Sequence, residues 1–193
     1  MAKRITFQFE DDLDYQMQAI HSTVELFRGL SRHVDGIYRP NRIRKVGEGD
    51  PVRNNDIVVG SRLLENLRKV QLSNDLFADN VLADGNNFTI EMETGTGKTY
   101  VYLRTILELY QEYGFRKFMI VVPSIAIRKG VEKSMEQLAD HFKRLYNIDI
   151  GKHSFIYDSK NPKQISSKLV ESNDLSICVL NIQAFNKDTN ILR

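Results

Sequence analysis

The residues best placed to do chemistry form one short run in the middle of the chain: Thr94, Gly95, Thr96, Gly97, Lys98 and Thr99. Its glycines leave backbone N–H groups free to surround phosphate oxygens, because no Cβ stands in the way. Lys98 can neutralise the β- and γ-phosphates of a nucleoside triphosphate, and the Thr99 hydroxyl can ligate Mg²⁺. The full pattern also asks for a glycine where this chain has Met92. We predict a phosphate-binding loop; the alternative is a glycine-rich helix start without a ligand.

The segments beside this loop predict a strand before it and a helix after it. Phe88-Thr89-Ile90 is a short apolar run, and helical spacing of large side chains begins at about Lys98 and ends before Gly114. A helix start places partial positive charge where phosphates would lie. The expected order is therefore strand, tight loop and helix.

The rest of the chain predicts alternating strands and helices. Strands are expected at 4–10, 117–122, 148–150, 154–157 and 176–182, and helices at 11–30, 62–71 and 131–145. Residues 36–60 read as a loop or insertion with excess basic residues, either a solvated loop or one that faces DNA. Such alternation predicts an α/β fold with a mostly parallel sheet and helices on both faces. We expect a division into residues 1–87, with a strand, a helix and the basic insertion, and residues 88–193, from the phosphate loop to a strand ending near 183.

Two further places could contact ligands. The amide of Gln16 can donate to N7 and accept from N6 of adenine, as any surface glutamine could. The apolar strand before Pro123 ends at the edge where parallel sheets bind ligands, and a nucleic-acid phosphate could be held there by Ser124, Arg128, Lys129 and free N–H groups. An N-capped helix with ordinary solvated basic residues explains the second place equally well.

Composition excludes several classes of protein. The chain has 193 residues, a formal net charge of +2 and one cysteine, Cys178. No disulfide can form within it, which fits a cytoplasmic location, and no apolar run suggests a signal peptide or a membrane span. The four histidines show no metal-binding spacing.

The last strand ends in Asn181-Ile182-Gln183 rather than in the acidic pair that would organise Mg²⁺ and water, so we expect nucleotide binding without rapid hydrolysis.

The motifs together resemble the restriction (Res) subunit of type III restriction–modification enzymes, within superfamily 2 helicases and translocases. The resemblance covers nearly the whole chain and is carried by four stretches: residues 15–20 (Tyr-Gln-Met-Gln-Ala-Ile), 92–99 (Met-Glu-Thr-Gly-Thr-Gly-Lys-Thr), 121–124 (Val-Val-Pro-Ser) and 180–186 (Leu-Asn-Ile-Gln-Ala-Phe-Asn). The form of the phosphate loop is rather specific for restriction translocases, which include type I motor subunits. Superfamily 2 loops often lack the first glycine, which accounts for Met92.

This resemblance implies an ATP-driven motor of RecA-like domains that acts on duplex DNA with Mg²⁺, beside a modification (Mod) methyltransferase subunit. It implies that Gln16 reads adenine and that Pro123, Ser124 and Arg128 contact the DNA backbone. The parent protein would be a site-specific deoxyribonuclease that hydrolyses ATP. The chain would hold only part of the first motor domain, because the acidic box, the second motor domain and the nuclease are missing. Another superfamily 2 motor, such as a type I motor subunit or a repair helicase, and a nucleotide- or DNA-binding module without turnover stay open.

Overall fold

The computed structural model describes residues 10–34, 37–40, 61–78, 86–158, 161 and 163–185. The chain divides into two compact units, one of residues Asp14–Arg116 and one of Lys117–Arg193 with Met1–Leu13. The strand expected at 4–10 falls almost wholly outside the described residues. In the part of the chain that the structure describes, no helix has the length and apolarity needed to cross a bilayer.

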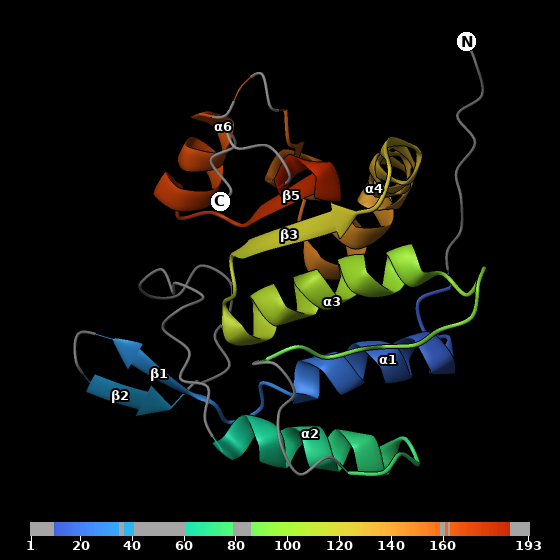
Figure 1. The fold of residues 1–193 in the computed structure, drawn as a ribbon, viewed down its shortest axis with the longest axis vertical. Helices are drawn as coiled ribbons and strands as arrows, with labels where there is room; N and C mark the ends of the chain where they lie inside the picture. The colour runs from blue at the N-terminus through green and yellow to red at the C-terminus, as the bar shows by residue number, and fades with distance from the viewer. Residues whose placement is uncertain are drawn as a thin grey trace. The chain divides into compact units, whose positions relative to one another are not determined.

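The first unit is built on three helices (Figure 1): α1 (Asp14–Glu25), α2 (Ser61–Ser73) and α3 (Lys98–Tyr113). Helix α1 contacts both of the others. The helices predicted at 62–71 and after Lys98 are confirmed, and Gly114 ends α3 in the left-handed conformation, with φ of 75°. Helix α1 ends at Glu25, earlier than its apolar spacing suggested.

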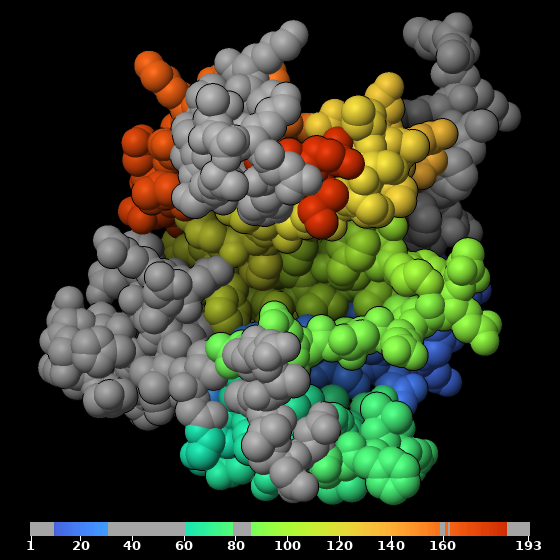
Figure 2. All heavy atoms as spheres, in the orientation of Figure 1, coloured from blue at the N-terminus to red at the C-terminus, as the bar shows by residue number. Residues whose placement is uncertain are grey.

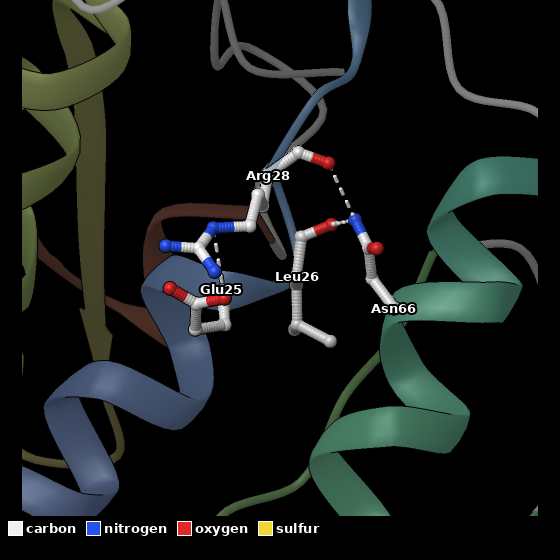
Figure 3. Close-up of polar contacts among 4 residues, drawn as sticks. All are labelled: Glu25, Leu26, Arg28 and Asn66. Carbon is white, nitrogen blue, oxygen red and sulfur yellow. Dashed lines mark hydrogen bonds and ion pairs between the residues drawn. The ribbon is translucent and has the colours of Figure 1, made fainter.

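The core between α1 and α2 is small and apolar. Leu26, Leu30 and Leu63 are buried together, and Phe27, Leu67, Val70, Phe88 and Phe115 pack against them. Asn66 of α2 adds a polar clamp (Figure 3): its amide donates to the carbonyl oxygens of Leu26, at 3.0 Å, and Arg28, at 2.8 Å. These carbonyls follow the last turn of α1 and would otherwise lack donors, so one side chain holds the end of one helix against another.

Two expectations for this unit were wrong. The expected loop at 36–60 contains a strand, β2 (Ile37–Pro40), which pairs antiparallel with β1 (Ser31–Val34). The expected strand Phe88-Thr89-Ile90 is absent, because these residues pair with no strand in the described part of the chain. Phe88 packs into the small core instead, whereas the Ile90 side chain is 48% exposed.

The second unit contains a three-stranded parallel sheet with the order β3-β5-β4 among the described strands. Its strands are β3 (Lys117–Val122), β4 (Ser154–Ile156) and β5 (Ser176–Asn181). All three were predicted. Five consecutive residues of β5, from Ser176 to Leu180, are buried, so both faces of this central strand are covered.

Helices of the second unit cover the sheet. Helix α4 (Ile125–Tyr146) contacts β3 and β5. Helix α6 (Lys163–Ile165) continues into the π-helix η2 (Ser166–Glu171), and both pack on Cys178 and Leu180 of β5. The strand expected at 148–150 was wrong, because helix α5 (Ile150–His153) begins at its last residue. The result is a mixed α/β fold with a small parallel sheet.

Candidate functional site

The Gly-Lys-Thr run forms a tight turn at the start of α3. Gly95 and Gly97 both have a φ of 85°, a left-handed conformation that side chains with a Cβ rarely adopt. Gly97 is the N-cap of α3 and provides no side-chain cap, so the first N–H groups of the helix are not satisfied by a capping side chain. The segment from residue 86 to 97 runs across the surface of its unit (Figure 2), with Thr94 and Gly95 exposed. The loop thus offers open N–H donors at a positive helix end.

Lys98 closes the loop on itself. Its Nζ donates to the carbonyl oxygens of Met92 and Glu93, the latter at 2.7 Å, and the Thr96 hydroxyl donates to the same Glu93 oxygen at 2.7 Å. An ammonium group has three donors, so one stays available for an anion. The loop is therefore held in its turn by its own side chains, with the positive charge of Lys98 beside it.

Gln16 reaches the phosphate loop from α1. Its side chain is only 7% exposed, and its Nε2 donates to the Thr96 carbonyl oxygen at 2.9 Å. The same nitrogen lies 3.4 Å from the Tyr15 hydroxyl. The structure therefore brings the predicted adenine reader into contact with the predicted phosphate loop, 80 residues away along the chain. The amide nitrogen has two N–H donors, so adenine could take the donor that faces Tyr15 at 3.4 Å while the bond to Thr96 is kept.

Thr99 and Lys98 differ in exposure. Lys98 is exposed, whereas Thr99 is half-buried in the first turn of α3. Burial raises the pKa of Tyr102, and a hydrogen bond from the Thr99 side chain opposes that rise. A hydrogen bond that lowers the pKa of Tyr102 is one in which the Thr99 hydroxyl donates its proton, so the lone pairs of the Thr99 oxygen remain for Mg²⁺. No group of three His, Cys, Asp or Glu residues in the described part of the chain is arranged to hold a metal ion.

The expected DNA contacts lie in the second unit. Ser124 is the N-cap of α4, and its hydroxyl accepts from the Ile127 N–H at 3.3 Å. Pro123 is exposed and Arg128 is half-buried at the same helix start. This geometry is that of an ordinary N-capped helix, which was the alternative to a DNA contact at this segment. The Ser124 hydroxyl accepts a hydrogen bond in this cap, so its own proton is free to donate.

Sequence reasoning missed one contact at this edge. The Gln183 amide donates to the Pro123 carbonyl oxygen at 3.2 Å, which ties the segment after β5 to the segment after β3. In register, Val122 pairs with Asn181, so both strands end at the same level. The sequence does place polar residues directly after these two apolar strands, which is a signal for a shared edge. It does not indicate that the two strands are neighbours in the sheet.

Comparison with known proteins places these features in one context. The family model described as "Type III restriction enzyme, res subunit" matches residues 11–192. The EcoPI Res subunit of Escherichia phage P1 is 28% identical over 166 residues, which is 84% of this chain and 16% of that protein. The EcoP15I Res subunit of Escherichia coli is 37% identical over 89 residues, 44% of this chain and 9% of that protein.

A third relative, the StyLTI Res subunit of Salmonella typhimurium, is 35% identical over 118 residues, 53% of this chain and 12% of that protein. The chain thus spans between 9% and 16% of the length of these relatives.

Proposed function

Because the chain belongs to the family of type III restriction enzyme res subunits, we propose that it is the ATP-binding N-terminal part of a DNA-dependent ATPase and translocase. The parent enzyme would be a type III restriction endonuclease, and the chain would form part of its first RecA-like motor domain. The observation that carries the proposal is the loop itself. Two left-handed glycines, open N–H groups at the start of α3 and the charge of Lys98 meet there.

The residues of the loop have separate roles in this proposal. The N–H groups from Gly95 to Thr99 hold phosphate oxygens, because a helix start favours negative charge. Lys98 adds a charge-assisted hydrogen bond to the β- and γ-phosphates. Thr99 provides an oxygen ligand for Mg²⁺, which, when bound with ATP, neutralises phosphate charge. Gln16 reads adenine with its carbonyl oxygen and with the N–H that does not bond to the Thr96 carbonyl.

DNA and the Mod methyltransferase subunit are the partners that we propose. Pro123, Ser124 and Arg128 would contact the DNA backbone, since a hydroxyl donor and a guanidinium group at a helix start suit phosphate oxygens. The Gln183 amide supports this idea, because it ties the Pro123 segment to the end of the neighbouring strand. Such contacts would position duplex DNA without reading its sequence.

A steady-state ATPase assay with and without duplex DNA tests this proposal. We expect ATP binding but no DNA-stimulated hydrolysis by this chain, because β5 ends in Asn181 rather than in an acidic pair. DNA-stimulated turnover by this chain would contradict that expectation. If calorimetric titration shows that the chain does not bind ATP, the proposed function is wrong.

Two alternatives predict different results. A type I motor subunit or repair helicase would bind ATP in the same way, but its full-length form would not cleave DNA when mixed with a Mod subunit. A binding module without turnover would show no ATPase activity even as the full-length protein. ATPase activity of the full-length protein separates both motors from a binding module, and cleavage of duplex DNA by the full-length subunit with its Mod partner then separates the type III enzyme from the other motor.

A further inference from the structure

A groove lies in the second unit, and none of the residues that line it has a role in the proposed function. It has a volume of about 580 Å³ and is lined by residues of α4, α5 and β4: Glu132, Met135, Glu136, Ala139, Gly151, Ser154, Phe155 and Ile156. Met135 and Phe155 are buried, which makes its floor apolar. Its volume falls within the range of about 300–1,000 Å³ that is typical of ligand sites.

The rim of the groove is acidic. Glu132 and Glu136 are one helical turn apart on α4 and both are exposed. Like charges at this spacing destabilise a helix slightly. No ion pair with a basic residue offsets them in the part of the chain that the structure describes. The groove therefore combines an apolar floor with two carboxylates that form no ion pair among the described residues, with Lys129 and Lys133 within one turn of them on the same helix.

Residues of β4 form one wall of the groove. Among the described strands, β4 pairs only with β5, so its other edge pairs with none of them. The Tyr157 N–H donates to the Val179 carbonyl oxygen at 2.9 Å. Because N–H groups alternate sides along a strand, the Ile156 N–H points away from β5. An open strand edge is a template for another extended chain.

We propose that this groove binds an extended, basic segment of a second protein, which adds a strand to the open edge of β4. Main-chain hydrogen bonds to the edge would supply affinity, as in other cases of strand addition. An apolar side chain would cover Met135 and Phe155, and lysine or arginine side chains would meet Glu132 and Glu136. The same carboxylates repel nucleic acid, so the surface selects a protein rather than DNA.

Titration of the whole chain with a capped seven-residue peptide of alternating lysine and valine, followed by fluorescence anisotropy, tests the proposal. No nucleotide is needed, so the result is independent of ATP binding. Glu136→Lys should weaken binding several-fold, and Glu132→Lys/Glu136→Lys by about tenfold, as expected for exposed ion pairs turned into repulsions. The double variant should instead bind the matching glutamate–valine peptide more tightly than the wild type does.

Two controls distinguish binding of the peptide in this groove from attraction of a basic peptide to any acidic surface. Asp140→Lys makes the same change in charge one turn further along α4, outside the groove lining, and should leave binding unchanged. A peptide with N-methylated alternate amides, which cannot pair with a strand edge, should lose binding. Equal weakening by Asp140→Lys and Glu136→Lys, or equal binding of the N-methylated peptide, would overturn the proposal. Circular dichroism of each variant verifies that it is folded.

Discussion

Replacing Gly97 by alanine is expected to separate backbone strain from loss of the Gln16 contact. A Cβ at Gly97 would lie 2.5 Å from the Gln16 Nε2 atom. That atom is the end of a flexible side chain, so the amide can rotate away rather than clash. Rotation, however, breaks the hydrogen bond from Gln16 to the Thr96 carbonyl oxygen.

Gly95→Ala is the matched control, because Gly95 has the same φ of 85° but no atom within 4 Å of an added Cβ. Both variants put alanine in the left-handed region, which costs about 1–2 kcal/mol. Gly97→Ala also loses one hydrogen bond, a net loss of about 1 kcal/mol. We therefore expect Gly97→Ala to lower the free energy of unfolding by about 1 kcal/mol more than Gly95→Ala does.

Urea unfolding of these variants, each with and without Gln16→Ala, measures this difference. The extra cost of Gly97→Ala should disappear once Gln16 is alanine, because the amide is then absent. Calorimetry with Mg–ATP should show the same pattern in affinity, with a coupling of about fivefold. Equal destabilisation by the two glycine variants, or an unchanged difference in the Gln16→Ala background, would refute the argument.

Three further predictions concern buried groups. Asn66→Leu leaves the carbonyls of Leu26 and Arg28 without their side-chain donor, and should lower stability by about 2–3 kcal/mol in urea unfolding; a loss below about 0.5 kcal/mol would exclude the clamp. Burial raises the pKa of the Cys178 thiol to about 11, so iodoacetamide should label the folded chain at pH 8 far more slowly than the urea-unfolded chain. Burial and the neighbouring Glu112 carboxylate raise the pKa of Tyr113. Its contribution to stability is then complete below the unfolded-state pKa of about 10 and declines as pH rises above it. The melting temperature should therefore fall less between pH 9 and 11 in Tyr113→Phe than in the wild type, and identical falls would disprove this.

Local signals in the sequence predicted most helices correctly. The spacing of large side chains and the stop at Gly114 located α3 within one or two residues. Helices are specified by neighbours three and four residues apart, so a single sequence contains that information. The apolar strands β3 and β5 were equally clear, because continuous burial requires continuous apolar residues.

Non-local pairing could not be predicted in the same way. Phe88-Thr89-Ile90 has the composition of a strand, but a strand needs an edge to pair with, and Phe88 packs beside Leu26 and Leu63 instead. For the same reason the residues of β2 were read as part of a loop. An antiparallel pair is defined by its register, and the sequence of one strand alone does not contain it.

In the candidate site, too, local features were predictable from the sequence and contacts between distant residues were not. The phosphate loop is one short segment, and its glycine positions alone predicted the turn. The contact from Gln16 to Thr96 spans 80 residues, and the sequence predicted the type of side chain without its partner. The contact between Gln183 and Pro123 also depends on which strands are neighbours, so only the structure revealed it.

The central claim, that this loop binds ATP, is tested most directly by calorimetric titration of Mg–ATP into the wild type and Lys98→Ala. We expect saturable binding of one nucleotide by the wild type and a loss of about tenfold or more in the variant, because a charge-assisted hydrogen bond is removed. Lys129→Ala, which removes an exposed lysine of the second unit, should bind as the wild type does. Equal affinity in the wild type and Lys98→Ala would contradict the claim.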